Sequence, residues 1–180
     1  MESSSQLLLI KKLKVDKMKG TTAICPGSFD PVTVGHLDII RRAATMFERV
    51  IVVVMTNGSK HPSFTAEERM QMISESTKDI LNVSVDQYNG LLADYAALHG
   101  AGAVVKGLRA MSDFEYEFQM ALTNKKLNPN VETLFLTTSA QNMYLSSSMV
   151  KQIAGMGGDV SDFLPTVIYD DVLKRISSKK

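Results

Sequence analysis

The residues best suited to chemistry stand between Pro26 and His36, where the sequence reads Pro-Gly-Ser-Phe-Asp-Pro-Val-Thr-Val-Gly-His. A short apolar run, Thr21 to Cys25, precedes this stretch, and apolar residues at helical spacing follow it. A loop between a strand and a helix presents unpaired backbone N–H groups and the positive end of the helix dipole, and proteins hold phosphates there. Because Ser28 adds a hydroxyl and His36 adds an imidazole, the stretch predicts phosphate chemistry.

Basic side chains follow two other expected strands. Lys60 follows the β-branched run 50–55, and Lys106 ends a further apolar run, three residues before Arg109. A lysine that closes a buried strand needs water or an anion, and an arginine can grip phosphate oxygens with two N–H groups. Gly107 would let the backbone approach a ligand closely. We therefore expect both loops to bind anions.

Three consecutive hydroxyls, Ser146, Ser147 and Ser148, stand at the start of a helix, which we expect Ser147 or Ser148 to cap and which should run to Ala154. A helix N-cap needs only one serine. The run therefore indicates an anion cradle built from hydroxyls, backbone N–H groups and the helix dipole.

Strand and helix signals alternate along the chain. The expected strands are 21–25, 50–55, 83–85, 103–106 and 133–137. The expected helices are 36–47, 65–77, 91–98, 112–126, 147–154 and 165–176, with capping boxes at Thr65 to Glu68 and Ser112 to Glu115. This order predicts an α/β fold with a Rossmann-like, doubly wound, five-stranded parallel sheet. Ligands of such folds bind beyond the carboxyl ends of the strands, where the candidate loops would meet.

The composition is that of an ordinary globular protein, with 180 residues, 44% hydrophobic residues and a net charge of +1. This charge predicts no nucleic-acid or membrane partner, and no apolar run reaches the roughly 18 residues of a membrane span. The single cysteine, Cys25, excludes an internal disulfide and fits a reducing cytoplasm. It reads as a buried strand residue. Residues 1–18 read as an N-terminal extension, disordered or non-native, and residues 19–180 as one domain.

Taken together, the motifs resemble the bacterial phosphopantetheine adenylyltransferase family of the nucleotidyltransferase superfamily over residues 20–175. The matching segments are 26–31, 33–36, Lys60, Lys-Gly-Leu-Arg at 106–109, Asp-Phe-Glu-Tyr-Glu at 113–117 and Leu-Ser-Ser-Ser-Met-Val-Lys at 145–151. The first segment alone marks the superfamily, whereas the combination is specific to this family. Thr33 stands where the superfamily often has histidine, and Lys106 and Lys151 stand where arginine is frequent. His61 stands where a second lysine is common.

The resemblance implies transfer of AMP from ATP to 4′-phosphopantetheine, which yields dephospho-coenzyme A and pyrophosphate in coenzyme A biosynthesis. It implies that His36, Lys60, Lys106 and Arg109 are catalytic, and that His36 stabilises charge in the transition state. Because the nucleophile is an existing phosphate oxygen, the reaction requires alignment and charge stabilisation but no protein base.

The resemblance also implies two sets of binding residues. The ATP-binding residues would be Ser28, Phe29, His36, Gly107, Leu108, Arg109, Glu117, Asn142, Met143, Tyr144, Leu145, Ser146, Ser147 and Ser148. The residues that bind phosphopantetheine would be Ser28, Lys60, Leu92 and Lys106. The family further implies Mg²⁺ as cofactor, a homohexamer and feedback inhibition by coenzyme A. No acidic cluster in the sequence marks ligands for the metal, so phosphates and water would hold most of its coordination shell.

Two alternatives stay open. One is a related nucleotidyltransferase with another acceptor, such as nicotinamide mononucleotide or a cytidylyl acceptor. The other is a nucleotide-binding sensor without catalysis. Pyrophosphate release from ATP, measured with phosphopantetheine, with nicotinamide mononucleotide and without an acceptor, distinguishes the three.

Overall fold

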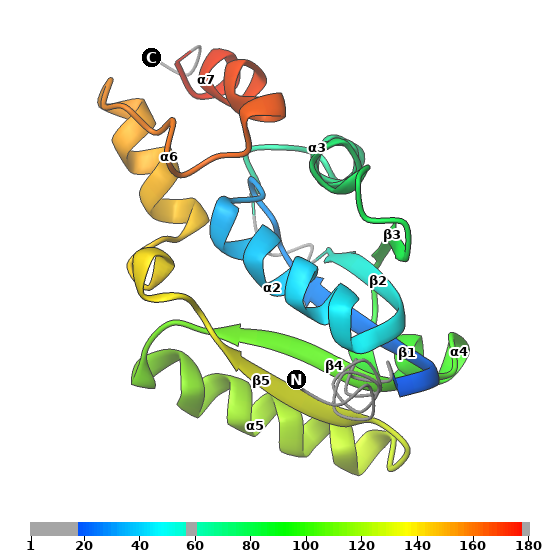
Figure 1. Cartoon of the computed structure of the whole chain (residues 1–180). Coiled ribbons are helices and arrows are strands. Elements are labelled where there is room, and N and C mark those ends of the chain that lie inside the picture. Colours follow the sequence, from blue (N-terminus) through cyan, green and yellow to red (C-terminus); the bar gives the residue numbers. More distant parts are fainter. Residues whose placement is uncertain (1–17, 57–60, 178–180) are drawn as a thin grey trace, which may run out of the picture.

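A single parallel sheet forms the centre of the protein in the computed structural model, which describes residues 18–56 and 61–177 (Figure 1). The strands are β1 (Met18–Gly27), β2 (Phe47–Met55), β3 (Val83–Tyr88), β4 (Ala101–Leu108) and β5 (Glu132–Thr137). The α-helices are α2 (Val34–Met46), α3 (Ala66–Thr77), α4 (Leu92–Leu98), α5 (Met111–Leu127), α6 (Ser147–Gly155) and α7 (Tyr169–Ser177). Two short 3₁₀ helices, η1 (Ala140–Asn142) and η2 (Thr166–Ile168), precede α6 and α7.

The order of the strands is β3-β2-β1-β4-β5, and all neighbouring pairs are parallel. The chain therefore moves outward from β1 to β3, returns through α4, and moves outward on the other side through β4 and β5. This confirms the predicted doubly wound, five-stranded sheet. The direction reverses between β1 and β4, and a crevice for ligands opens at such a switch point, beyond the carboxyl ends of the two strands.

The helices divide between the two faces of the sheet. One buried cluster joins α2, α3, α6 and α7 to side chains of β1, β2 and β4, including Cys25 and Val105. The opposite cluster joins α4 to Ile24, Ile51 and Val104. Alternate residues of each strand thus enter different clusters, as the period of two in a strand requires. Figure 1 shows α5 beneath β4 and β5, and α2 above the strands.

Most predicted elements are confirmed, with shifts at their ends. Met18, which we assigned to the extension, is the first residue of β1 and pairs with Phe47. Phe47, expected at the end of a helix, instead begins β2, because α2 ends directly at the strand. The predicted extension otherwise falls in residues 1–17, outside the described part.

Two predicted helix caps are wrong. α5 begins at Met111 with Ala110 as N-cap, so Ser112 lies inside the helix and is not the N-cap of the predicted capping box. α6 is capped by Ser146, which accepts a hydrogen bond from the N–H of Met149 over 3.1 Å. In the described part of the chain, no helix is long and apolar enough to cross a bilayer.

Candidate active site

A capping box at the start of α2 holds His36. Thr33 is the N-cap, and its hydroxyl accepts a hydrogen bond from the N–H of His36 over 3.4 Å. In return, the N–H of Thr33 donates to Nδ1 of His36 over 3.0 Å. The acceptor of this second bond is commonly a glutamate or glutamine side chain, and here it is an imidazole. The helix therefore begins two residues before the predicted position, and the histidine closes its first turn.

This contact determines where the imidazole carries its proton. A backbone N–H can only donate, so Nδ1 must accept, and the neutral ring carries its proton on Nε2. Burial of the ring, together with the positive charge of Arg109, lowers the pKa of His36 from 6.5 to about 4. At neutral pH the ring is therefore uncharged, and Nε2–H is a hydrogen-bond donor.

Phe29 shapes the loop between β1 and α2. Its backbone has a φ of 47°, in the left-handed region that non-glycine residues rarely adopt. Its buried ring contacts the His36 ring edge-on, with centroids 5.1 Å apart, and lies so close to Gly27 that a Cβ there would be 2.9 Å from Phe29 Cε2. The ring thus supports His36 from inside the protein, and any ATP contact of Phe29 would come from its backbone.

Arg109 follows β4 and is held by an acidic residue of α5. Its Nε lies 2.9 Å from Oδ2 of Asp113, and its Nη2 lies 3.1 Å from Oδ1. Its Nη1 donates to the carbonyl of Leu145 over 3.1 Å. The guanidinium therefore connects β4 to the segment before α6, while its positive charge acts on His36.

Lys106 pairs with Glu117 of α5, with 3.2 Å between Nζ and Oε2. Both side chains are about one-fifth exposed, which leaves each within reach of solvent. The structure therefore brings together the cation and the carboxylate that the resemblance assigned to the acceptor and to ATP respectively. A substrate phosphate would have to share or replace this ion pair.

Position 107 requires a residue without a side chain, but for a different reason from the one we expected. A Cβ at this position would lie 2.8 Å from Cγ1 of Ile39 in α2. The close approach is therefore between β4 and a helix, and it does not by itself indicate a ligand. Leu108, the last residue of β4, accepts a backbone hydrogen bond from Thr138, the residue directly after β5.

The segment between β5 and α6 carries the remaining predicted ATP contacts. Ser146 caps α6, and the hydroxyl of Ser147 donates to the carbonyl of Pro31 over 2.7 Å. Of the three serines, only Ser148 is exposed. The predicted cradle of three hydroxyls therefore reduces to Ser148 and the backbone N–H groups of the helix start.

The residues just before the serines differ in exposure. Met143 and Tyr144 are exposed, whereas Leu145 is buried in the core. Asn142 ends η1 beside the start of α2, where a Cβ on Gly35 would lie 3.6 Å from Cβ of Asn142 and from Cδ2 of Leu145. The segments after β1, β4 and β5 thus meet at one edge of the sheet, as the parallel order requires.

Two of the remaining predicted residues, Leu92 and Ser28, make other contacts in the structure. Lys60 lies outside the described residues. Leu92 is buried between α4 and the sheet, so the structure gives it a packing role, and its contact with a pantetheine arm stays a prediction. Ser28 is exposed in the loop after β1, and its carbonyl accepts a hydrogen bond from Arg69 over 2.8 Å.

Sequence reasoning missed Asp30, Arg69 and Lys151 as a group. Arg69 is buried and bonds to the loop after β1, while the carboxylate of Asp30 pairs with Lys151. Their partners are 41 and 121 residues away along the chain. The only local signal was an aspartate inside the motif 26–36.

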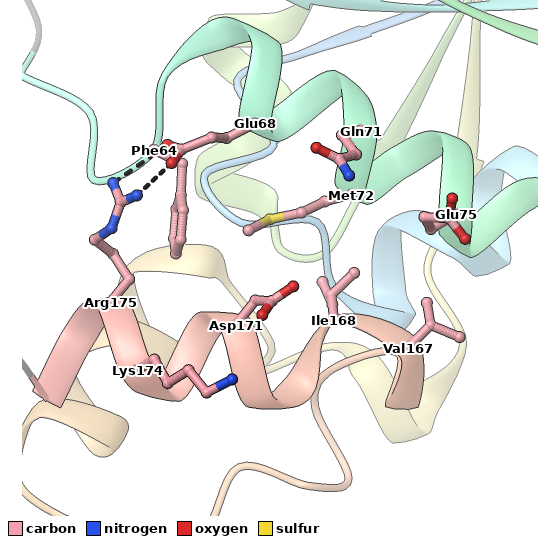
Figure 2. Close-up of a pocket in the computed structure, with 10 residues that line it drawn as sticks. All are labelled: Phe64, Glu68, Gln71, Met72, Glu75, Val167, Ile168, Asp171, Lys174 and Arg175. Carbon is pink, nitrogen blue, oxygen red and sulfur yellow. Dashed lines mark hydrogen bonds and ion pairs between the residues drawn. The ribbon is translucent and has the colours of Figure 1, made fainter.

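Two other features lie apart from this edge. Burial raises the pKa of the Cys25 thiol to about 12, which confirms a buried strand residue. A groove of about 410 Å³ separates α3 from α7, and none of the predicted site residues lines it (Figure 2). Arg175 pairs with Glu68 at one end of this groove and covers the ring of Phe64, so the groove marks the contact between two helices.

Comparison with known proteins identifies the family. The profile of the family described as Cytidylyltransferase-like matches residues 24–153. A phosphopantetheine adenylyltransferase of Caldanaerobacter subterraneus subsp. tengcongensis is 56% identical over 85% of this chain and 96% of its own length. Those of Heliobacterium modesticaldum and Clostridium tetani are 54% and 52% identical, over 88% and 87% of this chain and 92% and 98% of their own lengths.

A solved structure supports the fold. A putative nicotinate-nucleotide adenylyltransferase of Vibrio parahaemolyticus superposes with a TM-score of 0.61 over 85% of this chain and 98% of its own. Its sequence identity is 17%, so the likeness concerns the fold alone. The long matches at 52–56% identity decide the family, and this chain belongs to the phosphopantetheine adenylyltransferases.

Proposed function

We propose that this protein transfers AMP from ATP to 4′-phosphopantetheine and releases dephospho-coenzyme A and pyrophosphate. The names of relatives at 52–56% identity support the identity of the acceptor. The observation that carries the chemistry is the Thr33–His36 contact, because it leaves a neutral imidazole with Nε2–H as donor at the start of a helix. The donor lies at the switch point of the sheet, where phosphates bind in folds of this kind.

The proposed reaction is an in-line displacement at the α-phosphorus of ATP. A phosphate oxygen of the acceptor forms the new bond to phosphorus, and the bond to the oxygen that bridges to the β-phosphate breaks. Nε2–H of His36 would donate to an oxygen of the α-phosphate as its charge grows. Arg109 would add positive charge on the same side, and the N-terminus of α6 would bind the departing pyrophosphate or the β- and γ-phosphates.

Magnesium belongs to this proposal as a charge-neutralising partner of the triphosphate. Among residues 18–56 and 61–177, no three histidine, cysteine, aspartate or glutamate side chains come together in a group that could hold a metal ion. We therefore assign no protein ligand to Mg²⁺ and derive no step through it. Phosphate oxygens and water would fill most of its coordination shell.

Assembly and regulation form a second part of the proposal. α5 exposes the large apolar side chains Tyr116, Phe118 and Leu122, which are 65%, 44% and 57% exposed. Such a surface on a monomer favours association, which supports the predicted homohexamer. Sedimentation velocity tests it, and a single monomeric species would contradict it. Feedback by coenzyme A and a cytoplasmic location are predictions from the family resemblance and from the single cysteine.

One assay distinguishes this function from its alternatives. Pyrophosphate release from ATP and Mg²⁺ is measured with 4′-phosphopantetheine, with nicotinamide mononucleotide and without an acceptor. We expect release only with phosphopantetheine. Release only with nicotinamide mononucleotide would establish the related transferase, and nucleotide binding without release in any arm would establish a sensor.

A further inference from the structure

We propose that Asp30 is a positioning residue for nucleotidyl transfer, which holds three segments of the site in one fixed arrangement. This inference rests on the proposed function. The three segments are the loop between β1 and α2, the residues that lead into α3, and the first turns of α6. Asp30 lies in the first segment and bonds to the other two.

The carboxylate of Asp30 receives the backbone that leads into α3. Oδ1 and Oδ2 each accept from the N–H of Ser63 over 3.0 Å, and Oδ1 also accepts from the N–H of Phe64 over 3.0 Å. Asp30 is 7% exposed, so water contributes little to its solvation. The N–H groups of Ser63 and Phe64 solvate the carboxylate in place of water. They also fix the end of the connection between β2 and α3, where Ser63 stands three residues after Lys60 in the sequence.

Lys151 of α6 completes the partners of Asp30. Its Nζ lies 2.5 Å from Oδ2 of Asp30, and the two side chains are 27% and 10% exposed. Burial opposes ionisation of Asp30, but Lys151 and the two N–H groups outweigh it and hold the pKa of the carboxyl below its usual value. A buried carboxylate of this kind is stable only while its partners stay in place.

The residues on either side of Asp30 link it to the chemistry. The Ser28 carbonyl is bonded to Arg69, and the Pro31 carbonyl is bonded to Ser147. Phe29, directly before Asp30, contacts the ring of His36. A displacement of Asp30 would therefore move both the support of His36 and the start of α6.

Fixed placement matters because the reaction joins two anions in line. A misplacement of about 1 Å away from the reacting atoms can lower turnover by about 100-fold. An ion pair that served stability alone could be replaced by packed apolar side chains with little loss. The two roles therefore predict different results for turnover in variants that fold.

The experiment uses the full chain, four single variants and the double variant that combines Asp30→Asn with Lys151→Met. Asp30→Asn removes the charge and keeps an oxygen for Ser63 and Phe64, whereas Lys151→Met removes the cation and keeps its aliphatic length. Lys151→Arg is the conservative variant. Lys125→Met is the control, because it breaks an exposed lysine–carboxylate pair, with Glu132, outside the site. Steady-state kinetics with ATP, Mg²⁺ and phosphopantetheine are measured at least about 15 °C below the melting temperature of each variant.

We expect kcat to fall by about 100-fold in Asp30→Asn and in Lys151→Met. KM for each substrate should change by less than about threefold, because the loss concerns alignment during transfer. The double variant should be no slower than either single variant, since both break the same junction. Lys151→Arg and Lys125→Met should stay within about threefold of the natural protein.

Each other outcome has a distinct meaning. If the natural protein releases no pyrophosphate with phosphopantetheine, the proposed function fails before the variants are compared. If the natural protein is active and the folded Asp30→Asn and Lys151→Met variants turn over within about threefold of it, the positioning role is wrong. Should Asp30→Asn not fold, Lys151→Met and its arginine counterpart decide the question alone.

Discussion

The backbone N–H of Thr33 donates to Nδ1 of His36 over 3.0 Å, while the hydroxyl of Thr33 lies 2.9 Å from the same nitrogen. One residue thus caps the helix and orients the histidine. Both the N–H and the hydroxyl of Thr33 therefore lie within hydrogen-bond distance of the imidazole at the helix start. Helix capping and donor placement at the site are therefore one structural feature.

Replacing the imidazole should affect turnover far more than binding. His36→Ala removes the Nε2–H donor, and loss of a single donor to a developing charge lowers kcat by about 10²–10³-fold. KM for ATP should change little, because Arg109 and the start of α6 remain. The assay is steady-state pyrophosphate release. His99→Ala is the matched control, since His99 lies at the end of α4 against Tyr95, and it should retain full turnover. Near-normal kcat in His36→Ala would contradict the role of the donor.

The two capping boxes found among residues 18–56 and 61–177 offer a matched pair of variants. Thr33→Val and Thr65→Val each remove a hydroxyl that caps a helix, at α2 and at α3. Both should lower the free energy of unfolding by about 1 kcal/mol. Only Thr33→Val should also lower kcat, by about 10-fold, because only this hydroxyl contacts the imidazole. Denaturant titration and steady-state kinetics measure the two effects, and an equal loss of kcat in both variants would count against the contact.

The tautomer of His36 can be observed directly. In ¹⁵N NMR of the imidazole, we expect the proton on Nε2 and an unprotonated Nδ1 at pH 7, with a pKa of about 4. Arg109→Ala should raise this pKa, because the charge of Arg109 disfavours the imidazolium, although burial should keep it below 6.5. A signal from a protonated Nδ1 would overturn the assignment.

The lowered pKa of His36 has a consequence for stability. Because the unfolded chain binds this proton near pH 6.5 and the folded chain near pH 4, the contribution of the neutral ring is complete above pH 6.5. It should decline as the pH falls from 6.5 through about 4. Urea titrations of the natural protein and of His36→Gln at several pH values measure it. The difference between the two should shrink toward low pH, and a difference independent of pH would refute the coupling.

A substitution at Gly107 tests whether the close approach of β4 to α2 serves packing. Gly107→Ala should destabilise the protein by about 1–3 kcal/mol, because the new Cβ would meet Ile39. In the double variant with Ile39→Ala, the added methyl group gains room. The double variant should therefore lose less stability than the sum of the losses in the two single variants. Additive losses, together with a selective rise in KM for ATP, would instead indicate that Gly107 faces the ligand.

The fold and the place of the site followed from local patterns. Alternating strands and helices require parallel crossovers, and parallel strands bring their carboxyl-end loops to one edge, so His36 and Arg109 were predictable neighbours. Their partners were not. Asp113 lies only four residues after Arg109, but an acidic residue in the first turn of a helix is also favoured by the helix dipole, and only the structure shows the bidentate pair.

Long-range polar contacts were beyond prediction for a physical reason. The partners Asp30 and Lys151 are separated by 121 residues, and nothing in either local sequence specifies the other. The predicted role of the three serines was wrong for a different reason, because these residues are neighbours in the sequence. Ser146, Ser147 and Ser148 are equivalent in composition, and the register of α6 decides which one caps, which one bonds to Pro31 and which one faces solvent.

The loop after β1 depends on contacts made much later in the chain. Pro31 is bonded to Ser147, and the N–H of Val34 donates to the carbonyl of Phe163 over 3.1 Å. During synthesis, the ribosome therefore makes this loop well before the residues that contact it. A nascent chain that ends before residue 163 can pair its strands but cannot close the loop, so nucleotide binding should begin only when translation is nearly finished.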